Sequence, residues 1–301
     1  MNLAHYSPFV KVLARSFPLQ KGGVCMTPQD AAKKIIVALD SDNDAVIRRH
    51  TSELGAHVGM LKIGLQAFVA FGPAIVDEAK RFGRVFLDLK LVDIPATMAG
   101  AVRAATIHGV AMTNVYADAG EAGMRAAVQA RDEAWVIRQQ RFPDESQKPL
   151  LIGVTVLTSQ KHSDLVKAGT LPKPNVLFGS ADLRADANAD AGERALRDLV
   201  VRRAVLTKES GLDGVVCSPE EIRLVREACG EGFLIVTPGV RPAWADANDQ
   251  KRVMTPSEAV KVGADYLVIG RPILKPPTEV GTPEEAVKRI VKEICGESEA
   301  A

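Results

Sequence analysis

The sequence predicts a single (β/α)₈ barrel of the α/β class, and three observations favour this fold. Short runs rich in β-branched and other apolar residues recur eight times, each ending in polar, Gly or Pro residues. Segments with helical apolar spacing, such as 75–82 and 96–107, lie between most of these runs, which is the alternation of a parallel sheet. The eight units fill about 270 residues, and such barrels usually have about 250. A doubly wound open sheet is the alternative.

The strands and the domain boundaries follow from this alternation. Residues 1–32 precede the first unit and are predicted to form an N-terminal extension, and residues 33–296 form the barrel domain. The segment 171–203 breaks the spacing after the fifth strand and is predicted to be an insertion, which costs little extra loop-closure entropy. The predicted strands are Ile35–Leu39, Val58–Ile63, Val85–Leu89, Ala111–Tyr116, Leu150–Val156, Gly214–Val216, Phe233–Val236 and Tyr266–Ile269.

Composition and charge exclude several classes of protein. Hydrophobic residues make up 47 % and charged residues 25 % of the 301 positions, as in ordinary globular domains. The 38 Lys and Arg nearly balance the 37 Asp and Glu, so no overall field favours nucleic acid or an anionic membrane. The most apolar stretch, 58–76, is interrupted by Lys62 and Pro73, which argues against a membrane span.

The four cysteines form no CxxC pair, and the N-terminus lacks the features of a secretory signal. Both observations predict reduced thiols and a cytoplasmic protein. The five histidines are scattered, without the spacing that would place two on one helix face beside a carboxylate, so a metal site is not expected.

The densest chemical signal is the run from Phe86 to Thr97. Side chains two apart in a strand share a face, so Asp88 and Lys90 should project together while their neighbours face the helices. Pro95 cannot continue a central strand and suits a helix start, so Asp93 and Ile94 should lie in the following loop. In a barrel that loop belongs to the catalytic face. The alternative is a structural ion pair beside a capping Asp.

Charged residues also end the first two strands. Lys62 lies inside an apolar run at the end of the second strand, and a buried ammonium needs a paired anion. Asp88 on the neighbouring strand is the expected partner. Asp40 ends the first strand, where its carboxylate is placed to accept hydrogen bonds from sugar hydroxyls or to cap a helix.

Two Gly-Arg segments follow the seventh and eighth strands, where barrels commonly bind phosphate. Glycine lets the backbone approach an anion, and arginine adds a charge-assisted contact. Gly239 to Arg241 and Gly270 with Arg271 are therefore candidate phosphate ligands, with simple turn formation as the alternative reading. The polar segment 242–250 is expected to act as a lid over the phosphate.

Taken together, these residues resemble the bacterial branch of the orotidine 5′-phosphate decarboxylases from about Ile35 to Ile273. The hallmark is Asp-x-Lys-x-x-Asp followed by Ile-Pro-x-Thr, present here as Asp88 to Thr97. Further matching stretches are 61–64, 153–159, 211–218, 236–242 and 266–272. Two features depart from the family pattern: Tyr116-Ala117 stands where members usually have His-Ala, and the segment after the fifth strand is long.

The resemblance implies a cofactor-free conversion of orotidine 5′-monophosphate to uridine 5′-monophosphate and CO₂ in pyrimidine biosynthesis. Lys90 would donate the proton to C6 and Asp88 would lie beside the substrate carboxylate. The other implied roles are ribose binding by Asp40 and Lys62, pyrimidine binding by Thr158, phosphate binding by Arg241, Gln250, Gly270 and Arg271, and entry of Asp93, Ile94 and Thr97 into the partner subunit's site.

These roles imply a homodimer and require neither pyridoxal phosphate nor a metal. An electron pair left at C6 lies in the ring plane without an electron sink, so a fixed ammonium is the available stabiliser. Two other functions stay open. A Mg²⁺-dependent sugar-phosphate decarboxylase or aldolase of the same superfamily shares the Asp-x-Lys-x-x-Asp element, and a non-catalytic nucleotide-phosphate binder would share the fold.

Overall fold

A computed structural model describes residues 26–172, 181–245 and 254–297, with side chains of the helix that starts at residue 181 described from residue 191 onward. Eight parallel strands pair in chain order and the eighth pairs with the first, so the sheet is a closed barrel. The strands are β1 Ile35–Leu39, β2 Met60–Gly64, β3 Val85–Leu91, β4 Met112–Tyr116, β5 Leu150–Val154, β6 Gly214–Val216, β7 Leu234–Pro238 and β8 Tyr266–Ile269. Closure confirms the predicted (β/α)₈ fold and excludes the open sheet.

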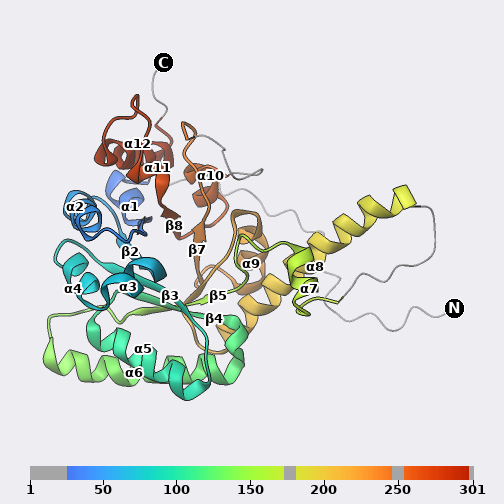
Figure 1. Ribbon diagram of the computed structural model, residues 1–301, viewed down its shortest axis with the longest axis horizontal. Helices are drawn as coiled ribbons and strands as arrows, with labels where there is room; N and C mark the ends of the chain where they lie inside the picture. Colours follow the sequence, from blue (N-terminus) through green and yellow to red (C-terminus); the bar gives the residue numbers. More distant parts are fainter. Residues whose placement is uncertain (1–25, 173–180, 246–253, 298–301) are drawn as a thin grey trace.

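Helices surround the barrel, and α5 and α6 lie side by side along one flank (Figure 1). Local signals set several helix starts: Thr255 and Thr282 each form a capping box with a Glu three residues later, and a Pro follows each Thr. The helices are α1 Pro28–Lys33, α2 Asp44–Leu54, α3 Leu65–Phe71, α4 Ala74–Lys80, α5 Pro95–His108, α6 Gly120–Arg141, α7 His162–Lys167, α8 Ala181–Glu209, α9 Ile222–Cys229, α10 Pro256–Lys261, α11 Arg271–Leu274 and α12 Pro283–Cys295. Across the described ranges, none of them is long and apolar enough to span a bilayer.

Alternation along the strands divides the core into two layers. One layer packs between strands and helices and includes Leu61 and Leu87, while the other fills the barrel interior. The interior residues are Ile36, Met60, Phe86, Met112, Ile152 and Val236. Because alternate residues of a strand share a face, the next inward positions toward the carboxyl ends of β2, β3 and β4 are Lys62, Asp88 and Asn114. Inside the barrel, a layer of polar residues thus lies nearer the carboxyl ends of the strands than the apolar layer.

The last residues of the segment 171–203, which is predicted to be an insertion, contact the barrel. Helix α8 begins inside it and runs on to Glu209, and Figure 1 shows its first turns extending away from the barrel body. Val200 is fully buried, and Arg203 Nη1 donates to the carbonyl oxygen of Thr155 at 2.6 Å. The last turns of the predicted insertion therefore contact the barrel. Similarly, α1 lies across the predicted boundary at residue 33, packs on α12 and buries Ala31.

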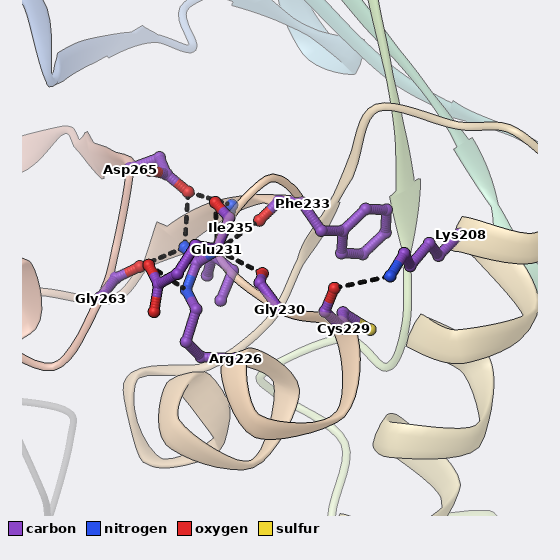
Figure 2. Close-up of polar contacts among 9 residues, drawn as sticks. All are labelled: Lys208, Arg226, Cys229, Gly230, Glu231, Phe233, Ile235, Gly263 and Asp265. Atoms are coloured by element: carbon purple, nitrogen blue, oxygen red, sulfur yellow. Dashed lines mark hydrogen bonds and ion pairs between the residues drawn. The ribbon is translucent and has the colours of Figure 1, made fainter. Parts of the chain in front are cut away.

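At the amino ends of β7 and β8, Arg226 joins three segments of backbone (Figure 2). Its side chain is 11 % exposed, and its guanidinium donates to Asp265 Oδ2 at 2.7 Å and to the carbonyl oxygens of Gly263 and Phe233 at 2.6 and 2.7 Å. Asp265 Oδ2 also accepts from the backbone N–H of Ile235 at 2.8 Å. This network fixes the end of the barrel opposite the catalytic face.

Substituting Arg226→Met should lower the free energy of unfolding by about 3 kcal/mol, because it leaves a partly buried carboxylate and several carbonyls without their charged donor. Turnover should change less than about twofold, since the network lies at the far end of the strands. Urea denaturation would measure the loss. Arg223→Met, on the exposed face of the same helix, is the matched control and should change stability by less than about 0.5 kcal/mol.

Candidate active site

Four charged side chains form a continuous chain across the carboxyl ends of β1, β2 and β3. Lys62 Nζ lies 2.8 Å from Asp40 Oδ2 and 3.2 Å from Asp88 Oδ2. Lys90 Nζ lies 2.7 Å from Asp88 Oδ1. The predicted pairing of Lys62 with Asp88 is confirmed, and Lys62 is closer still to Asp40. Signs alternate along the chain, so each charge faces an opposite one.

Pairing keeps Lys62 and Asp88 ionised although both are buried. The side chains of Lys62 and Asp88 are 7 % and 10 % exposed. Burial alone would raise the pKa of Asp88, but the charges of Lys62 and Lys90, with hydrogen bonds from Lys90 and Asn114, bring it below its ordinary value. Burial alone would lower the pKa of Lys62, but Asp88 and Asp40 raise it above its ordinary value. Near neutral pH Asp88 is therefore an ionised carboxylate that faces the charged ammonium of Lys62.

Local structure explains why Asp40 faces this chain. Helix α2 is capped by Asn43, whose side chain accepts from the backbone N–H of Val46, so Asp40 is not the cap of α2. Gly64 makes room for the pair, because a Cβ there would lie 1.9 Å from Asp40 Oδ1 and 2.9 Å from Lys62 Nζ. The close approach of Asp40 and Lys62 thus requires glycine at the end of β2.

Lys90 departs from the strand geometry expected from the sequence. The side chains of Asp88 and Lys90 do meet, as predicted, but regular alternation ends there. Lys90 has φ of 51°, and across the described ranges it is the one non-glycine residue with positive φ. Its backbone N–H donates at 2.8 Å to the side chain of Asn114, a fully buried residue of β4.

The sequence reasoning missed Asn114, although a signal was present. Asn114 lies two residues after Met112, as Lys62 follows Met60 and Asp88 follows Phe86, and the three apolar residues share the barrel interior. A polar residue at this spacing in an apolar strand indicates an inward position at the carboxyl end. Asn114 Nδ2 donates to Asp88 Oδ1 at 2.7 Å, which extends the polar layer to β4.

The loop between β3 and α5 carries the second half of the hallmark on an exposed surface. Pro95 is the first residue of α5, as predicted, and Asp93 Oδ1 accepts from the backbone N–H of Ile94 at 2.7 Å. Asp93 and Thr97 are exposed, and Ile94 is 67 % exposed. All three residues face solvent in the single chain, and their role in a partner's site stays a prediction.

The two Gly-Arg segments follow β7 and β8, which are neighbours in the barrel. Gly239 has φ of 80°, and Arg241 continues the same loop, where its backbone N–H donates to the Met254 carbonyl at 3.1 Å. Gly270 precedes Arg271, the first residue of α11. Because β8 pairs with β1, the loop after β8 is the next one to Asp40 around the barrel rim. Gln250 and part of the predicted lid, 246–250, lie outside the described residues.

A cleft of about 650 Å³ opens at the carboxyl ends of the strands, where the loops after β5, β6 and β7 meet α8. Thr158 lines this cleft together with Ser218, Pro238 and Gly239. Its lining does not include Asp88 or Lys90, so the cleft and the charged chain are formed by different residues. Its walls bring Thr158, on the loop after β5, to the same rim as the candidate phosphate loop after β7.

Tyr116 helps to hold the loop that carries Thr158, through its contact with Gln160. The Arg203 guanidinium lies 6.0 Å from the centre of the Tyr116 ring, and the phenol donates to Gln160 Oε1 at 3.5 Å. Arg203 also pairs with Asp118. Burial, with the charge of Asp118, raises the pKa of Tyr116 above its ordinary value, so the phenol stays protonated.

A closed barrel with ion-paired lysines at the carboxyl ends of its strands places the chain among (β/α)₈-barrel enzymes. A sequence profile of the "Orotidine 5'-phosphate decarboxylase / HUMPS family" matches residues 33–290. The chain belongs to this family. Across the residues that the structure covers, no three His, Cys, Asp or Glu side chains gather as metal ligands would.

Curated relatives and a solved structure agree with this placement. The orotidine 5′-phosphate decarboxylase of Trichlorobacter lovleyi is 45 % identical over 270 residues, 89 % of this chain and 98 % of that protein. The enzyme of the same name from Moorella thermoacetica is 45 % identical over 271 residues, 89 % and 95 % of the two chains. A crystal structure of the Lactobacillus acidophilus orotidine 5′-phosphate decarboxylase matches with a TM-score of 0.67 at 30 % identity, covering 86 % of this chain and 98 % of that one. The predicted enzyme class, a decarboxylase of pyrimidine biosynthesis, is confirmed.

Proposed function

We propose that this chain decarboxylates orotidine 5′-monophosphate by direct protonation of C6 from Lys90, without a cofactor. The observation that carries the proposal is the alternating chain from Asp40 through Lys62 and Asp88 to Lys90. In the reaction the bond between C6 and the carboxyl carbon breaks and CO₂ leaves. The electron pair that stays on C6 takes a proton from Lys90 Nζ, which regains one from solvent through its 38 % exposed side chain.

In this proposal the two charges nearest the reaction have complementary tasks. The Lys90 ammonium stabilises negative charge as it develops at C6. The Asp88 carboxylate, held ionised by Lys62, would lie beside the substrate carboxylate and repel it until CO₂ leaves. Because two ammonium groups and an amide already occupy the oxygens of Asp88, this carboxylate is a poor ligand for Mg²⁺. That arrangement favours the metal-free reaction over a sugar-phosphate enzyme of the same superfamily.

The remaining groups bind the rest of the substrate in an order that follows the barrel rim. Arg241, Gly270 and Arg271 after β7 and β8 would hold the phosphate, and Gln250 is assigned to the same task from the sequence. Asp40 and Lys62 on the next strands would meet the ribose, and Thr158 after β5 would meet the pyrimidine. Phosphate binding far from C6 supplies free energy for ordering the reacting groups.

We also propose that the functional unit is a homodimer in which Asp93, Ile94 and Thr97 complete the partner's site. Support comes from the β3–α5 loop, where Val92 and Ile94 are 57 % and 67 % exposed although both are large and apolar. Exposed apolar side chains beside a site indicate a surface that is covered in the assembly.

The test of the proposed reaction follows the loss of orotidine 5′-monophosphate absorbance with purified protein in excess EDTA. Turnover should be the same with and without the chelator. Turnover that stops with EDTA would instead indicate the metal-dependent chemistry of the superfamily. Binding of uridine 5′-monophosphate without any turnover of substrate would identify an idle nucleotide binder and overturn the proposal.

A further inference from the structure

The ladder between β3 and β4 is interrupted at the catalytic lysine. Leu87 pairs with Thr113 and Leu91 with Val115, so the stretch from Asp88 to Lys90 on β3 lies opposite Asn114 alone on β4. Such a bulge bends its strand and directs a side chain differently from a regular ladder. Here the bulge ends at Lys90, whose φ of 51° is rarely adopted by residues other than glycine.

The side chain of Asn114 fills the gap in the ladder. Its Oδ1 accepts from the Lys90 backbone N–H at 2.8 Å, and its Nδ2 donates to Asp88 Oδ1 at 2.7 Å. That carboxylate oxygen also accepts from Lys90 Nζ at 2.7 Å. The amide orientation is fixed by chemistry, because a backbone N–H only donates and the ionised Asp88 only accepts. One fully buried side chain thus holds the backbone of Lys90 and the carboxylate that its ammonium faces.

We propose that Asn114 is a positioning residue for decarboxylation, which holds the left-handed bulge that turns the Lys90 ammonium toward Asp88. This inference rests on the proposed role of Lys90 as proton donor. Asparagine suits the position because it offers an acceptor and a donor on one short planar group. Aspartate would lack the donor and place a second negative charge against Asp88, and an aliphatic residue would lack both groups. Without the amide, Lys90 is free to relax to a common backbone conformation that moves its ammonium.

The experiment compares Asn114→Ala with the matched control Thr113→Val. Thr113 is also buried, and its hydroxyl donates to the Leu87 carbonyl at 3.0 Å, so it bridges the same strands one residue before the bulge. We expect kcat of Asn114→Ala to fall about 100-fold, the size of loss caused by misplacing a reacting group by about 1 Å. Its affinity for uridine 5′-monophosphate, which lacks the reacting carboxylate, should change less than about threefold. Thr113→Val should lose thermal stability but keep kcat within about threefold.

A purely structural role for Asn114 would give a different pattern. The inference is overturned if folded Asn114→Ala keeps kcat within about threefold of the parent, or if Thr113→Val loses as much kcat as Asn114→Ala. Should the alanine variant not fold, Asn114→Leu fills the same space without the acceptor for Lys90 or the donor to Asp88, and it must show the same selective loss of kcat. An inactive parent would refute the proposed reaction itself, which separates that failure from failure of this inference.

Discussion

Replacement of Lys90 by alanine should lower kcat for decarboxylation by about 10⁴-fold or more. Removing a general acid typically costs about 10²–10⁴-fold, and removing a group that stabilises developing charge costs about 10²–10³-fold. Lys90 is proposed to do both at one carbon atom. Single-turnover measurement with excess enzyme would isolate the chemical step from substrate binding and product release.

The variant should fold and bind product, because Asp88 keeps its contacts with Lys62 and Asn114. Affinity for uridine 5′-monophosphate within about threefold of the parent would establish this. A matched control is Lys208→Ala, which removes an ammonium that donates to the Cys229 carbonyl at 2.8 Å at the opposite end of the barrel (Figure 2). That variant should retain full kcat. A Lys90→Ala enzyme with more than about 1 % of parental kcat would rule out Lys90 as the proton donor.

Mixing Lys90→Ala with Asp93→Ala protein should restore activity that neither variant has alone. If Asp93 enters the partner's site, a mixed dimer has one site with both defects and one site with neither. Random exchange between equal amounts of the two variants makes about half of all dimers mixed, so about a quarter of all sites are intact. The recovered kcat should therefore approach a quarter of the parental value, measured after incubation that allows subunit exchange.

A mixture of Lys90→Ala with Asp88→Ala is the control for this complementation. Asp88 and Lys90 contact each other within one chain, so every mixed dimer keeps a defect in both sites and no activity should return. Recovery in the control and the Asp93 mixture alike would show that mixing itself restores activity. If the Asp93 mixture stays inactive although mixed dimers form, Asp93 acts within its own chain.

Many strands of the barrel could be predicted from the sequence, because local residue patterns specify strands. Three of the predicted strands match the structure at both ends, namely Ile35–Leu39, Gly214–Val216 and Tyr266–Ile269, since β-branched runs bounded by polar or Gly residues favour extended backbone. The motif from Asp88 to Thr97 was placed correctly as a strand end, a loop and a helix beginning at Pro95. Proline and alternation act within a few residues, so their effects need no knowledge of the rest of the chain.

Helix α8 shows what such local patterns leave undetermined. It was predicted to belong partly to an insertion because the spacing of strands breaks between 171 and 203, and the structure shows that Val200 and Arg203 pack on the barrel. Which turns of a long helix are covered depends on what lies beneath them. No local pattern in that segment reports the position of β5 and its loop.

By itself, the sequence determined the strand and helix alternation, the family hallmark and the inward positions of Lys62 and Asp88. Only the tertiary structure decided that the sheet closes through β1 and β8, that Lys62 also pairs with Asp40, and that Asn114 meets Lys90 and Asp88 across a broken ladder. Those facts depend on pairing between segments that are distant in the chain. The left-handed backbone of Lys90 is unfavourable locally and persists because a buried side chain from the next strand holds it.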